Sequence, residues 1–89
     1  MSMDPNAVSS SIRDFVAKTF LYSDQGFPYP DDASFLEEGV IDSLGIMEMV
    51  SFVEKQFGIS VADAEILPGN FDSVEQLSRY VGGKMVHAS

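Results

Sequence analysis

Ser43 is the residue of this sequence whose type and position offer the most chemistry. It opens a segment with helical spacing, so its hydroxyl could cap that helix by accepting a free backbone N–H. The same position offers exposed backbone donors and the positive end of a helix dipole, which would stabilise a phosphodiester attached to the serine oxygen. Ser43 is therefore a candidate both for a helix cap and for a modified serine.

The helix that Ser43 opens surrounds it with apolar and acidic residues. At 100° per residue, Leu44, Met47 and Phe52 fall outside the buried stripe. The arc around Ser43 comprises Leu44, Met47, Glu48, Ser51 and Glu54. Scattered exposed apolar residues are normal on protein surfaces. The alternative is a docking face, on which the two hydrophobic residues give apolar contact and the carboxylates give orientation.

Three segments with the spacing of amphipathic helices must position this arc: residues 6–20, residues 43–57, and the segment from Val74 to Val81. In each segment the apolar residues recur on one side, which we expect to face a common core. These predicted core positions are Val8, Ile12, Phe15, Val16 and Phe20, then Ile46, Met49, Val50, Val53 and Phe57, and finally Val74, Leu77 and Val81.

The ends of these helices are marked by capping and breaking residues. Asp4 is a plausible cap for the first helix, and Gly58 is placed to stop the second. Asp72 or Ser73 can cap the last helix, which we expect Gly82–Gly83 to end, with a frayed tail beyond.

The connections between the helices differ in length. Residues 21–42 form a long loop that aromatic and aliphatic side chains should hold to the bundle, namely Phe27, Tyr29, Phe35 and Leu36. Residues 62–66 are expected to form one short helical turn, and Pro68-Gly69-Asn70 breaks the chain. The sequence predicts an all-α, small four-helix bundle of three main helices and one short helix. We expect one domain over residues 1–89, with an ordered core of about 5–83.

The formal net charge of −9 is concentrated in the middle of the chain. Between Phe20 and Ser78 lie twelve carboxylates and one base, Lys55. Such a field repels nucleic acid and anionic membranes and speeds encounters with basic protein surfaces, although acidity can equally serve solubility. Asp31–Asp32 and Glu37–Glu38 are interpreted as solvated charge or as the start of a helix. With no signal-peptide pattern and no apolar run of membrane-spanning length, we expect a cytoplasmic protein without membrane insertion.

Enzyme and metal-site hypotheses find little support in the residues. Ser43 followed by Gly45 resembles a nucleophile elbow, but Ile41 stands where its first glycine belongs. A serine triad needs a histidine, and His87 in the tail is the only one. The chain has no cysteine and no segment with the ligand spacing of a calcium loop. We therefore predict a protein that is not an enzyme and holds no metal.

The segment Gly39–Leu44, GVIDSL, resembles the attachment motif of acyl carrier protein-like domains, which bear 4'-phosphopantetheine on the serine of Asp-Ser-Leu. The triplet alone is a weak signal. Its context strengthens it, because residues 33–37, 54–59 and 71–74 resemble the family's segments around the second and last helices. The resemblance covers most of the chain and implies the four-helix carrier fold.

By this resemblance, Ser43 is the attachment point, with Asp42 and Leu44 as its motif partners. The positions implied to face partner proteins are Leu44, Met47, Glu48, Ser51 and Glu54. A magnesium-dependent phosphopantetheinyl transferase would move the arm from coenzyme A onto Ser43. A loading ligase and downstream transferases or synthases would then use the arm's thiol, which this cysteine-free chain lacks. We expect a monomeric carrier.

The cargo stays open between acyl and aminoacyl groups, and so does the pathway: fatty acid, polyketide or specialised metabolite synthesis. Gly45 stands where fatty-acid carriers commonly have an acidic residue, and Lys55 interrupts an acidic helix. A glycine after the motif is more similar to D-alanyl carriers and some stand-alone carriers. Ile41–Asp42 differs from the motif of typical peptidyl carriers. The alternative function is an acidic protein-interaction module without a prosthetic group.

Overall fold

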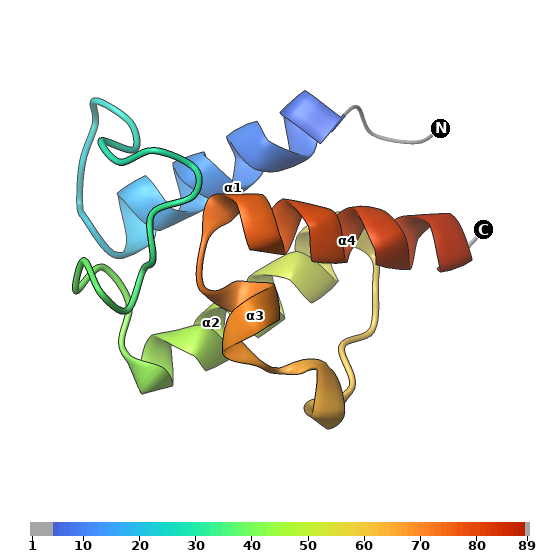
Figure 1. Ribbon diagram of the computed structural model, residues 1–89. Helices are drawn as coiled ribbons and strands as arrows, with labels where there is room; N and C mark the ends of the chain where they lie inside the picture. The colour runs from blue at the N-terminus through green and yellow to red at the C-terminus, as the bar shows by residue number, and fades with distance from the viewer. Residues whose placement is uncertain (1–4, 89) are drawn as a thin grey trace.

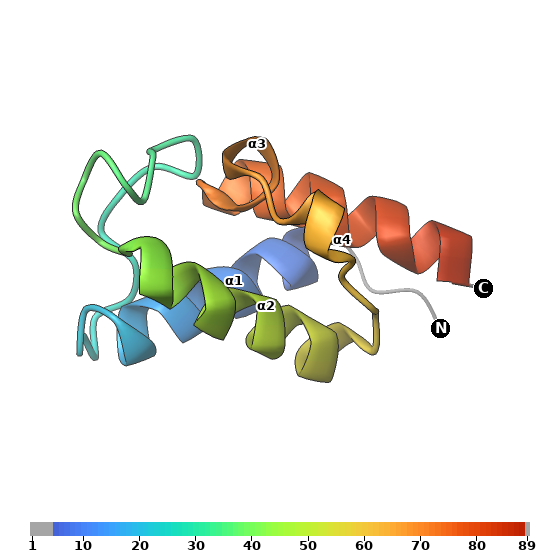
Figure 2. The same cartoon turned by 90° about the horizontal axis from the view of Figure 1, so that it is seen from below.

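Three helices of 15 residues each form the framework of the computed structural model, which describes residues 5–88: α1 (Pro5–Thr19), α2 (Ser43–Phe57) and α4 (Val74–Ala88). A 3₁₀ turn, η1 (Asp63–Glu65), and the one-turn helix α3 (Pro68–Phe71) connect α2 to α4. In Figures 1 and 2, α1 lies beside α4, and the start of α1 and the end of α4 are at the same end of the bundle. This architecture confirms the predicted all-α fold. The short helix, however, lies at Pro68–Phe71, where Pro68-Gly69-Asn70 was expected to break the chain, and the turn expected at residues 62–66 is the 3₁₀ turn η1. The proposed cap Asp4 lies outside the described residues.

The core lies where the faces of the three long helices meet. Eight residues at the predicted helical positions are at most 3% exposed: Val8, Ile12, Val16, Met49, Val53, Val74, Leu77 and Val81. Val50 is buried as well, and the other predicted core residues are half-buried against this cluster. The hydrophobic periodicity therefore predicted the core correctly, because burial of one face per helix is the main gain that offsets the entropy of folding.

Phe52, which the sequence pattern put outside the buried stripe of its helix, is half-buried against the core. Its ring stacks on Phe15 of α1 with 4.0 Å between centroids and 12° between planes. Phe57 meets the same ring edge-on at 6.0 Å. The helical projection of α2 alone missed this burial, because α1 covers a second side of α2.

The long connection from α1 to α2 is held by polar contacts as well as by aromatic packing. Phe35 is buried and Phe27 and Tyr29 are partly buried, as predicted, but Leu36 is 43% exposed and is not an anchor. Leu36 is instead attached through its backbone, whose N–H donates to the Asp72 carboxylate at 3.0 Å.

Asp31 also contributes to this connection, contrary to its interpretation as solvated charge. The Arg13 guanidinium donates to both carboxylate oxygens of Asp31 at 2.8 Å. This paired geometry lowers the pKa of Asp31 and raises that of Arg13. The ion pair joins α1 to the middle of the loop.

Two helix ends follow the predicted signals, and the end of the last helix does not. Gly58 ends α2 in the left-handed region at φ 67°, and Ser73 caps α4 by accepting the Gln76 N–H at 3.1 Å. The prediction that Gly82–Gly83 ends the last helix is wrong, because α4 continues to Ala88. Contacts made beyond the glycines, described below, offset their low helix propensity.

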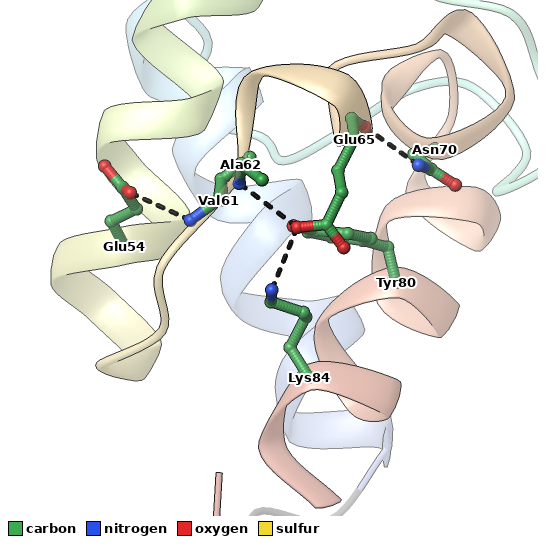
Figure 3. Close-up of polar contacts among 7 residues, drawn as sticks. All are labelled: Glu54, Val61, Ala62, Glu65, Asn70, Tyr80 and Lys84. Carbon is green, nitrogen blue, oxygen red and sulfur yellow. Dashed lines mark hydrogen bonds and ion pairs between the residues drawn. The ribbon is translucent and has the colours of Figure 1, made fainter. Parts of the chain in front are cut away.

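A polar cluster around Glu65 ties η1 to α4 (Figure 3). The Glu65 carboxylate accepts hydrogen bonds from Ala62 N–H, Tyr80 Oη and Lys84 Nζ at 3.1, 3.2 and 2.9 Å. Its backbone carbonyl accepts from the Asn70 side chain at 2.8 Å. Desolvation, with the nearby Glu65 charge, raises the pKa of Tyr80 to about 12, so the phenol stays protonated and donates.

Gly45, in the first turn of α2, is buried where the start of this helix meets Ile41 and the end of α1. A Cβ at this position would lie 2.6 Å from Ile41 Cγ2 and 3.1 Å from Phe20 Cε1. No side chain fits without displacing a β-branched neighbour. Glycine is therefore required here by close approach.

We predict that Gly45→Ala destabilises the domain by about 1–2 kcal/mol, because overpacking against Ile41 outweighs the better helix propensity of alanine. The matched control is Gly83→Ala in α4, where an added Cβ meets nothing within 4 Å. That change should stabilise by up to about 1 kcal/mol. Urea unfolding of both variants checks this, and equal effects of the two substitutions would contradict it.

A second prediction concerns pH and the Glu65 cluster. The hydrogen bond from Lys84, followed by that from Ala62, lowers the pKa of Glu65. A lowered folded-state pKa contributes stability above the unfolded pKa and loses it as pH falls through the folded value. Glu65→Gln should therefore reduce the free energy of unfolding at pH 7, and the difference from wild type should shrink at pH 3.

Urea unfolding at the two pH values measures this difference. The control is Glu75→Gln, which removes an exposed ion pair with Arg79. This substitution should lower the free energy of unfolding by at most about 0.5 kcal/mol. A Glu65→Gln deficit of the same size at both pH values would show that the carboxylate charge is not what stabilises the cluster.

Candidate functional site

The start of α2 is fixed by Asp42, which corrects the proposal that Ser43 caps this helix. Asp42 has extended backbone angles, φ −98° and ψ −176°, and its Oδ1 accepts the N–H of Gly45 at 2.8 Å. A carboxylate is a good N-cap because it satisfies a free donor and complements the helix dipole. With the cap taken by Asp42, Ser43 becomes the first helical residue and its exposed side chain is not needed to cap the helix.

Buried neighbours on either side hold Ser43 in place. Val40 and Ile41 are 8% and 2% exposed, and their N–H groups both donate to the Phe35 carbonyl, at 2.9 and 3.3 Å. Gly45 is buried one residue beyond Leu44. A short exposed segment between two anchored ones therefore presents the Ser43 hydroxyl at a defined place on the surface.

The backbone donors around Ser43 suit an anionic group on its oxygen. The N–H of Gly45 donates to the Asp42 side chain, and the N–H of Ile46 donates to the Asp42 backbone carbonyl. Within the described part of the chain, the N–H groups of Ser43 and Leu44 donate to no protein acceptor. Free N–H groups at a helix N-terminus stabilise a phosphate, so the residues present fit a phosphodiester on Ser43.

Four of the five predicted partner-facing residues are exposed beside Ser43. Leu44 is 81% and Met47 54% exposed, and Glu48 and Ser51 are exposed polar residues one and two turns further along. Two exposed apolar side chains beside a carboxylate thus form a compact surface patch next to Ser43.

Glu54 does not belong to this surface in the way the sequence suggested. It is half-buried, and its Oε2 accepts the Val61 N–H at 3.0 Å (Figure 3). The carboxylate thus closes the connection from α2 to η1. Its position on the helical projection was correct, but its partner comes from a chain segment that the projection does not include.

The sequence did not reveal an open groove between α1 and α2, with a volume of about 570 Å³. Phe15 and Thr19 form its α1 wall, and its α2 wall consists of Met47, Glu48, Ser51, Phe52, Lys55 and Gln56. Three of the predicted partner-facing residues therefore belong to this wall. The one available signal was Lys55, whose charge was out of place in an acidic helix.

The structure also bears on a metal site, a membrane span and a serine triad. Among residues 5–88, no group of three or more His, Cys, Asp or Glu side chains is placed to hold a metal ion. No helix in that range is long and apolar enough to cross a membrane. The side chain of His87, the histidine considered for a triad, lies outside the described residues.

Comparison with known proteins agrees with this geometry. Residues 10–81 match the family model described as "Phosphopantetheine attachment site", a range that includes the start of α2 and most of the buried helical faces. Over 50 residues the chain is 34% identical to a D-alanyl carrier protein of Abiotrophia defectiva, covering 56% of this chain and 63% of that protein. The aligned part is thus less than two thirds of that relative's length. With most of its length matched by the family model, the chain belongs to the phosphopantetheine-binding carrier family, whose members are non-catalytic carriers.

Proposed function

We propose that Ser43 carries the 4'-phosphopantetheine arm, and that the protein presents an acyl or aminoacyl group, held on that arm as a thioester, to partner enzymes. The observation that supports this most directly is the exposed Ser43 side chain at the start of α2, with the cap supplied by Asp42 instead. When bound, the arm supplies the thiol that the cysteine-free chain lacks.

A second Asp-Ser pair in the chain makes the choice of serine testable. Asp72-Ser73-Val74 also stands at the start of a helix, α4. Ser73, however, is only 4% exposed, and its hydroxyl oxygen accepts the Gln76 N–H. The Asp72 carboxylate accepts the Ser34 hydroxyl and the Leu36 N–H. Burial and occupied hydrogen bonds exclude Ser73 from an enzyme's reach, whereas Ser43 is open.

The attachment reaction needs a partner enzyme, and the chain contributes the acceptor. The Ser43 hydroxyl oxygen would bond to the phosphorus nearest the pantetheine in coenzyme A. The pyrophosphate P–O bond would break, adenosine 3',5'-bisphosphate would leave, and the serine proton would go to a base of the transferase. Free backbone N–H groups of Ser43 and Leu44 would then face the new phosphodiester.

The family implies a phosphopantetheinyl transferase and loading enzymes as partners. We propose that they approach over the surface of Leu44, Met47 and Glu48, because it is exposed beside Ser43 and acidic in a chain of net charge −9. Because the Abiotrophia relative is named a D-alanyl carrier protein, we propose that aminoacyl groups be tested as cargo on the arm.

The first prediction here is a mass increase. Incubation with coenzyme A, magnesium and a promiscuous phosphopantetheinyl transferase should add a single arm to the intact protein. Ser43→Ala should add none, and Ser73→Ala, if folded by circular dichroism, should load like wild type. Loading of Ser43→Ala would move the attachment site. A folded wild type that several transferases leave unmodified would favour the acidic interaction module.

The second prediction concerns Glu48, which is exposed beside Met47. Glu48→Lys should slow arm transfer at low salt, because it reverses a charge that attracts a basic partner, and the deficit should shrink as salt screens the interaction. Asp63→Lys, an equally exposed charge reversal in η1, is the matched control and should slow transfer less. Identical rates for the two variants at low salt would remove the docking role of Glu48.

A further inference from the structure

The groove between α1 and α2 has an order that links it to Ser43. Residues four apart on a helix are surface neighbours, and such rows wind slowly around the helix axis. One row of α2 starts at Ser43 and continues through Met47, Ser51 and Lys55, and the last three of these line the groove. The surface path from the proposed attachment point therefore leads directly into this hollow.

The walls of the groove combine an apolar floor with hydrogen-bonding groups. Phe15 and Phe52, stacked on each other, and Met47 provide the apolar part. Ser51, Gln56 and Thr19 provide neutral polar groups, and Lys55 provides a cation. This mixture matches a ligand that alternates short alkyl units with amides and hydroxyls, and it is poorly matched to a purely apolar chain.

A docking surface for basic partners does not explain the positive charge of Lys55. It is the single base among twelve carboxylates between Phe20 and Ser78, and it is exposed on the groove wall. An ammonium group here opposes a basic partner surface, but it can donate hydrogen bonds to carbonyl oxygens of a bound ligand. Lys55 thus gives the groove wall a charged donor for acceptor groups of a ligand.

We propose that the α1–α2 groove is a resting site for the chain's own phosphopantetheine arm, with the two amide groups of the arm beside Ser51 and Lys55. This proposal rests on the proposed attachment at Ser43. The occupant is tethered, so even weak contacts hold it, because a tethered ligand has a high effective concentration. The arm reaches far enough. Ser51 and Lys55 lie about 12 and about 18 Å along the helix axis from Ser43 at 1.5 Å per residue, and roughly fourteen bonds extend to about 17 Å at the spacing of an extended chain. The long side chain of Lys55 tilts toward the N-terminus of the helix, which brings its ammonium group within reach of the arm.

Binding in the groove would hold the arm against the protein whenever no partner enzyme is bound. The arm would cover Met47 and Ser51, which belong to the partner surface, so a docking enzyme would displace it and receive the thiol at the same time. The alkyl segments of the arm would shield Phe52 and Met47 from water. Binding of the arm and binding of a partner would thus compete for one wall of α2.

The test compares backbone amide NMR spectra of the apo protein and the arm-bearing protein, after intact mass has shown complete loading. We expect the arm to shift the amide signals of Phe15 and Thr19 in α1, together with those of Ser51 and Lys55. Thr19→Gln narrows the groove without changing charge, and in this variant the shifts at Phe15, Ser51 and Lys55 should be lost. Ser10→Gln, an exposed position elsewhere on α1, should keep them.

Three other results would overturn the proposal. Shifts confined to residues 42–45 would show an arm that stays in solvent. Shifts at Ile66, Leu67 and Phe71, without any in α1, would place the arm on the α3 side of α2. Unchanged shifts in Thr19→Gln would show that the α1 wall takes no part. If the mass of the protein never rises, the proposed attachment of the arm is itself wrong, and the groove then has no tethered ligand.

Discussion

The hydrogen bond from the Gly45 N–H to the Asp42 carboxylate fixes where α2 begins, and the rest of the site depends on that point. Because the cap is the residue before Ser43, the serine is the first helical residue and its side chain remains outside the capping interaction. Because Gly45 has no side chain, Ile41 and Phe20 can pack against this turn at close range. A single turn thus combines a rigid backbone with an exposed hydroxyl, which is what an acceptor for an enzyme in trans requires.

The fold was predictable where burial of one helix face dominates. The bounds expected for the second helix, residues 43–57, agree with α2, and the apolar stripes of all three helices form the core. Prediction failed where a contact distant in sequence overrides a local preference. Gly82–Gly83 should end a helix, yet α4 continues because Lys84 pairs with Glu65 and Met85 packs on the core.

The candidate site divides in the same way. The Asp-Ser-Leu motif and the exposure of Leu44 and Met47 follow from sequence and helical period alone. The groove does not, because it exists only once Phe15 of α1 lies against Phe52 of α2, and no single helix contains that information. The sequence shows that Lys55 is the single base in an acidic region, but only the position of α1 shows that Lys55 lines a groove.

The acidic residues of this chain have two separate functions, which net charge conceals. Glu54, Glu65, Asp31 and Asp72 accept specific hydrogen bonds that close loops, and a carboxylate committed in this way presents less of its charge to a distant partner. Glu48 is exposed beside the apolar residues next to Ser43 and is able to steer. Reversing a loop-closing carboxylate would leave a buried or half-buried donor without its acceptor, so its effect on partner binding would be indistinguishable from local unfolding. For the docking that we propose beside Ser43, the charge available for steering is therefore smaller than the net charge of −9 implies.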